Sequence, residues 1–185
     1  AVNTGEVSAR YPTGFTPAGW VFGIWSLIYL GLLVYSGYAV RTGGRGRTGH
    51  VMAPYLASCA GNIAWIFAWH YELIAASFAC MLVILVSLVV VYRRLDGEPP
   101  PSWSERAFSL YLGWITVATL ANLGALCYSL GAWPLGLAMD EWALVTVVGA
   151  VALYAVVGTR TGDWLYTAVF AWASLGIALQ PVGVG

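Results

Sequence analysis

The feature that most constrains this chain is a series of apolar stretches, each close to the length that an α-helix needs to cross a bilayer. About 20 apolar residues suffice for one crossing. Short segments rich in Gly, Pro and Arg separate the stretches. The sequence therefore predicts an all-α, polytopic transmembrane helical bundle with six spans, at residues 17–40, 51–70, 72–92, 108–128, 141–158 and 163–180.

The composition agrees with this prediction and excludes several classes of protein. Hydrophobic residues make up 60% of the 185 residues and charged residues 9%, as is typical of an integral membrane protein. The formal net charge is zero, so no nucleic-acid partner is expected. Lysine is absent, which excludes a retinal Schiff base. His70 and Glu72 are close in sequence, but no third ligand lies within reach, so no metal site is predicted.

The arginines predict the orientation of the bundle. When successive spans alternate across the bilayer, all the arginines except Arg10 fall on one side. Because cytoplasmic loops are enriched in basic residues, the Arg-rich loops 41–50, 93–106 and 159–162 are predicted to be cytoplasmic. Residues 1–16 and the C-terminus then face outward, and a bacterial inner (plasma) membrane is the expected location. An outward start favours a further helix upstream of residue 1, which would be the seventh.

One span carries a polar, aromatic face. At about 100° of turn per residue, Tyr111, Trp114, Ala118 and Asn122 lie on the same side of the helix at 108–128. An asparagine in hydrocarbon costs free energy unless its amide finds a partner. This face is therefore predicted to look into the protein or onto a bound molecule. Asn122 is assigned to hydrogen bonding between helices, whereas Asn62, in the second span, is left open between that role and ligand contact.

Two other spans have faces of the same kind, at three- and four-residue spacing. Aromatic surfaces with a few polar anchors suit a flat, hydrophobic small molecule. The predicted ligand-binding residues are Phe22, Trp25, Tyr29, Asn62, Trp65, Trp69, Tyr111, Trp114 and Ala118. No general acid or base accompanies them, so no catalytic residue is predicted, and binding is favoured over catalysis.

The order of these residues resembles that in the tryptophan-rich sensory protein, or translocator protein, family (TspO/MBR). The resemblance covers residues 15–130 and rests on Pro17, Trp20, Phe22, Trp25 and Tyr29, on Asn62 and Trp65, and on Trp114, Ala118 and Asn122. It implies a five-helix bundle whose second to fifth helices are the first four spans here. The chain then divides into an outward loop (1–16), a TspO-like four-helix portion (17–130) and two additional transmembrane helices (131–185), as in an extended branch of the family.

The resemblance also implies a ligand class, because members of this family bind porphyrins, haem-like tetrapyrroles and sterols. A porphyrin, another tetrapyrrole, or a sterol- or carotenoid-like molecule is therefore expected to bind for sensing, delivery or protection, with no cofactor required. Two alternatives stay open. The chain could be an accessory subunit of a larger membrane complex, because small residues in its last two spans permit close helix contact, or a homodimer, because Gly19 and Gly23 have a spacing that can mediate dimerisation. It could also degrade porphyrin in a light-dependent reaction.

Overall fold

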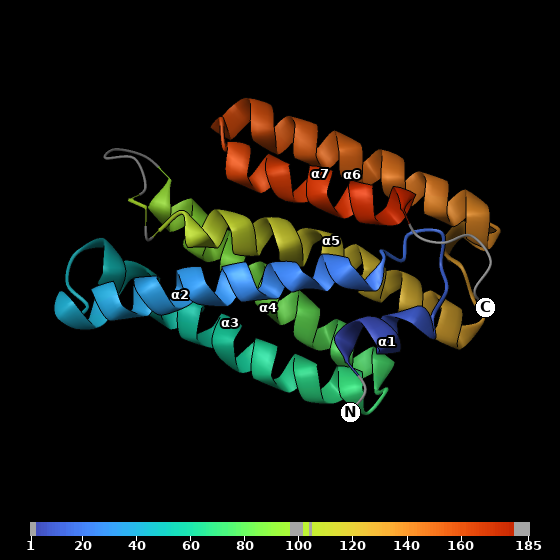
Figure 1. Cartoon of the computed structure of the whole chain (residues 1–185), viewed down its shortest axis with the longest axis horizontal. Helices are drawn as coiled ribbons and strands as arrows, with labels where there is room; N and C mark the ends of the chain where they lie inside the picture. The colour runs from blue at the N-terminus through green and yellow to red at the C-terminus, as the bar shows by residue number, and fades with distance from the viewer. Residues whose placement is uncertain (1–2, 97–101, 104, 180–185) are drawn as a thin grey trace.

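The computed structural model describes residues 3–96, 102–103 and 105–179, and all its regular structure is helical (Figure 1). Five helices are long and apolar enough to cross a membrane, and a sixth apolar helix, at the C-terminal end, is shorter. The predicted all-α class is confirmed. In chain order the elements are α1 (Thr4–Ala9), the 3-10 helix η1 (Gly19–Gly23), α2 (Ile24–Arg41), α3 (Arg47–His70), α4 (Ile74–Leu95), α5 (Ala107–Leu130), η2 (Pro134–Gly136), α6 (Met139–Thr161) and α7 (Trp164–Ala178).

The N-terminal segment differs from the loop predicted at residues 1–16. It contains α1, whose start is fixed by a capping box: the Asn3 side chain accepts a hydrogen bond from the Glu6 N–H, and the Glu6 carboxylate accepts one from the Asn3 N–H. Such reciprocal caps satisfy amide groups that the first turn leaves free. The segment is therefore a folded part of the molecule.

The first span also begins later than predicted. The sequence predicts a span from residue 17, but the Thr16 hydroxyl donates to the Tyr11 carbonyl, and the α-helical part of the span starts at Ile24. The Ala18 N–H donates to the Gly176 carbonyl on α7, at 3.1 Å. This tertiary bond holds the chain extended at Ala18, so only a 3-10 turn precedes α2.

The other boundaries move by a few residues, because helix ends extend into segments that composition marks as loops. α3 starts at Arg47 instead of Val51, and α4 ends at Leu95 instead of Tyr92. The turn between α3 and α4 is short, with Glu72 in the left-handed region at φ 55°. The predicted loop 93–106 includes Pro99–Pro101, which lie outside the described residues.

Around α5 the other helices form two groups (Figure 1). The α6–α7 hairpin lies on one side, where α7 packs against α5, and α2, α3 and α4 lie on the other. Interhelical hydrogen bonds fix these contacts: Ser77 on α4 donates to Asn122 on α5, and Trp172 on α7 donates to the Val21 carbonyl. The interhelical bond predicted for Asn122 is therefore present.

The arginines gather at one end of the bundle, as the alternation of spans predicts. At that end Arg47 pairs with Glu105 at 3.7 Å, and Arg94 donates to the His50 carbonyl at 2.6 Å. Arg10 lies at the other end, beside the α3–α4 turn. The side of the membrane that each end faces stays a prediction.

Candidate functional site

An aromatic cage lies where η1, α2, α3 and α5 converge. Six of the predicted ligand-binding residues line one cavity there, namely Phe22, Trp25, Trp65, Trp69, Trp114 and Ala118. The cavity is small, at about 20 Å³, which is room for about one water-sized sphere. The helical phase places these side chains on inward faces, and the meeting of the helices brings the faces together.

Some rings of the cage stack face to face, and others meet edge to face. Trp25 stacks on Trp65 with ring centroids 5.7 Å apart, and Trp65 stacks on Trp69 at 6.1 Å. Trp114 meets Trp25 edge-on, at 6.2 Å and 82°, and Phe22 meets Trp114 in the same way. Such pairs are favourable beyond the area that they bury. The cage thus offers both flat faces and ring edges to anything that enters it.

Two indole N–H groups in the cage lack a hydrogen-bond acceptor. The Nε1 atoms of Trp65 and Trp114 are buried and have no partner among the residues that the structure describes. By contrast, Trp69 Nε1 donates to the Thr4 carbonyl at 3.2 Å. A buried donor left unpaired costs about 1–3 kcal/mol. Both unpaired groups belong to residues that line the cavity.

The remaining three predicted residues form a separate hydrogen-bonded chain. Tyr29 donates to Asn62 Oδ1 at 3.2 Å, and Asn62 Nδ2 donates to the Tyr111 hydroxyl at 2.8 Å. These residues line a cleft of about 470 Å³ along α2 and α3, and Tyr29 is 49% exposed. The nine predicted residues therefore line two neighbouring hollows, which meet where Trp25 stacks on Tyr29 at 5.3 Å, and their role in ligand binding stays a prediction. Tyr29 lies one turn beyond Trp25 on α2, where that face looks out of the bundle.

Asn62 has both amide atoms engaged in this chain. Its oxygen accepts from α2 and its nitrogen donates to α5, so it joins three helices. The polar connection between helices, one of the two roles left open for Asn62, is thus observed. Ligand contact by Asn62 stays a prediction, and any such ligand would lie in the Tyr29 cleft and not in the cage.

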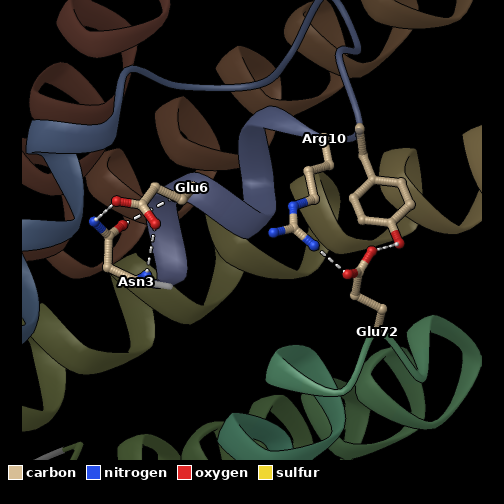
Figure 2. Close-up of polar contacts among 5 residues, drawn as sticks. Asn3, Glu6, Arg10 and Glu72 are labelled. Carbon is tan, nitrogen blue, oxygen red and sulfur yellow. Dashed lines mark hydrogen bonds and ion pairs between the residues drawn. The ribbon is translucent and has the colours of Figure 1, made fainter. Parts of the chain in front are cut away.

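The N-terminal segment closes the end of the cage, which was not predicted from the sequence. Ser8 of α1 and Pro17 line the cavity. Arg10 and Tyr11 both bind Glu72 in the α3–α4 turn, Tyr11 at 3.0 Å (Figure 2). Burial, followed by the hydrogen bond to Glu72, raises the pKa of Tyr11 above its usual value. We call residues 3–18 the lid and the contacts to Glu72 the latch.

Sequence reasoning missed the lid because only local signals mark it. The pair Asn3 and Glu6, at capping-box spacing, was the one pattern that could have indicated α1. Sequence reasoning also missed Met81, Val117 and Ala121, which line the cavity together with Asn122. Their apolar side chains do not differ from those that face lipid, so nothing in the sequence distinguishes them.

Within the part of the chain that the structure describes, no three His, Cys, Asp or Glu side chains are grouped so that they could hold a metal ion. Glu72 is engaged in the latch, and the ring of His70 lies 3.0 Å from the Ile66 carbonyl. The site chemistry is therefore that of aromatic surfaces and neutral hydrogen-bond donors.

The comparisons agree with the fold and the motifs. A family model described as TSPO-like protein matches residues 1–183. The match includes α6 and α7, so these two helices fall inside the matched region although the sequence motifs end before them. No curated protein and no solved structure matches the chain. With helices long and apolar enough to cross a bilayer and a family match over nearly its whole length, the chain is an integral membrane protein that belongs to the TSPO-like protein family.

Proposed function

We propose that this protein binds a flat, hydrophobic small molecule with hydrogen-bond acceptors in the aromatic cage, for sensing, delivery or protection. The observation that carries the proposal is the pair of buried, unpaired indole N–H groups of Trp65 and Trp114 at one cavity. A donor that costs free energy in the empty site contributes fully when an acceptor arrives. A buried polar group without a partner in a native structure calls for an explanation, and an acceptor on a bound ligand supplies one.

The donors restrict the ligand class. A tetrapyrrole carries carboxylates, and a sterol carries a hydroxyl, so each supplies an acceptor. A pure hydrocarbon carotenoid supplies none, and it would leave both indole groups unpaired. Among the expected ligands, a porphyrin-type tetrapyrrole fits best, because its flat face also suits the stacked rings of Trp25, Trp65 and Trp69.

The cavity must expand for such a ligand to enter. Ligand sites usually measure about 300–1,000 Å³, whereas the closed cage has about 20 Å³. The lid covers one end of the cavity, where the latch to Glu72, the bond from Trp69 to Thr4 and the bond from Ala18 to Gly176 hold it to the bundle. We therefore propose that binding includes opening of the lid.

Titration of the purified protein with protoporphyrin IX, followed by the absorbance of the porphyrin, tests the donors. Each of Trp65→Phe and Trp114→Phe keeps an aromatic ring but removes the N–H, and should weaken binding by about tenfold. Trp103→Phe is the matched control, because Trp103 is 83% exposed, and it should leave the affinity unchanged. Wild-type affinity in the double variant would overturn the proposal.

The association rate of protoporphyrin tests the latch. Glu72→Gln removes the ion pair with Arg10, so the lid should open more often and protoporphyrin should associate several-fold faster in stopped-flow mixing. Asp140→Asn, an exposed carboxylate at the same end of the bundle, is the control. An unchanged association rate in the Glu72 variant would show that the ligand enters by another route.

A further inference from the structure

A second site lies away from the cage, in a groove bordered by α4, α5 and α6. Its volume is about 460 Å³, and it shares no lining residue with the cage or with the Tyr29 cleft. Its apolar wall consists of Leu85 and Val89 of α4, Leu112 of α5, and Leu153, Val156 and Val157 of α6. The wall is therefore an apolar surface that suits a hydrocarbon chain.

The groove exists because α6 stands against α7 more than against α4. At the arginine-rich end, Gly158 faces Thr167 of α7 so closely that an added Cβ would lie 2.7 Å from the threonine hydroxyl. Tyr154 anchors the middle of α6 by donating to the Gly113 carbonyl of α5. With α6 fixed to α7 and α5, its flank at Leu153, Val156 and Val157 overhangs the groove.

The groove carries charge at one end only. Arg93, in the last turn of α4, and Arg160, in the last turn of α6, both line it. Neither makes an ion pair with any residue that the structure describes. Asp96 is the one carboxylate among the lining residues, so the lining itself carries one net positive charge. The Tyr92 hydroxyl beside it already donates to Asp163, at 2.9 Å.

We propose that this groove binds one anionic phospholipid, with an acyl chain along the apolar wall and the phosphate between Arg93 and Arg160. Guanidinium groups bind phosphate with strong, charge-assisted hydrogen bonds. Basic sites between transmembrane helices bind anionic head groups in this way. A partner helix would cover the apolar wall but would bring no anion to the two arginines. Charge complementarity therefore favours an anionic lipid over a partner helix.

Native mass spectrometry of the intact protein in neutral detergent tests the proposal. The protein is titrated with dioleoyl-phosphatidylglycerol and, separately, with dioleoyl-phosphatidylcholine, which has the same chains and no net charge. The anionic lipid should bind with a clear preference. Arg93→Gln and Arg160→Gln should each reduce its affinity by about fivefold, and Asp96→Asn should increase it. Arg41→Gln, an exposed arginine at the same end that does not line the groove, is the control.

Two further measurements distinguish the contribution of the acyl chains to lipid binding from that of the head group. Val156→Trp fills the groove and should weaken both lipids, whereas Val151→Trp, on α6 but outside the groove, should not. Glycerophosphoglycerol, the head group without chains, should fail to compete. Equal binding of the two lipids would overturn the proposal, and so would an unchanged preference for the anionic lipid in the double arginine variant. Competition from the free head group would overturn it as well. A Val156→Trp variant that alters the oligomeric mass but not lipid binding would show that a protein partner covers the groove.

Discussion

α5 and α6 have nearly the same length, 24 and 23 residues, and both are apolar enough to cross a membrane, yet their surroundings are opposite. In their most apolar 18-residue stretches, 67% of α5 is buried within the protein and 11% of α6. α5 carries Tyr111, Thr119 and Asn122 through its length, and each has a hydrogen bond. The mean hydropathy is 1.5 for α5 and 2.0 for α6, so the polar residues in mid-span accompany the helix that other helices surround.

The largest expected contrast concerns packing. Ile115 of α5 is fully buried, whereas Leu144 of α6 is 65% exposed. Ile115→Ala should destabilise the protein by about 2 kcal/mol or more, because it leaves a cavity among neighbouring helices. Leu144→Ala should cost less than about 0.5 kcal/mol, since lipid fills the space. Unfolding by sodium dodecyl sulfate in mixed micelles, followed by circular dichroism, measures both. Equal losses would mean that α6 is covered by protein.

The next contrast concerns two glycine-to-alanine substitutions, which are expected to change the stability in opposite directions. A Cβ on Gly113 of α5 would lie 3.1 Å from the Tyr166 carbonyl oxygen and 3.1 Å from the Val169 Cβ, so α7 would have to shift. Gly113→Ala should therefore destabilise by about 1–2 kcal/mol. Gly149 of α6 has open space, and Gly149→Ala should stabilise by up to about 1 kcal/mol. The same unfolding assay applies, and destabilisation by the α6 variant would contradict the exposed position of Gly149.

The smallest effect lies at the point where α6 resembles α5. Tyr154 is buried and donates to the Gly113 carbonyl. Tyr154→Phe should cost about 0.6 kcal/mol, the average for a hydrogen bond between membrane helices. Tyr38→Phe is the control, since Tyr38 of α2 is 46% exposed. A loss of several kcal/mol at Tyr154 would mean that this bond orders the whole α6–α7 hairpin.

The spans were predictable because apolarity over about 20 residues is a local property. The inward faces of Trp25, Trp65 and Trp114 were predictable for the same reason, since helical phase depends only on spacing. The start of α2 was not, because the bond from Ala18 to Gly176 joins residues at opposite ends of the sequence. The division between the cage and the Tyr29 cleft was not either, because it depends on how far each helix extends past its neighbour.

The sequence by itself determined that this is an integral membrane protein of helices, that its arginines lie at one end, and which side chains share a helical face. Each of these follows from composition or from the period of one helix. Only the tertiary structure decided that the lid closes the cage and binds Glu72, that Trp65 and Trp114 have no acceptor among the described residues, and that α6 is peripheral. These depend on which faces meet, and apolar surfaces that pack against protein or against lipid have the same composition.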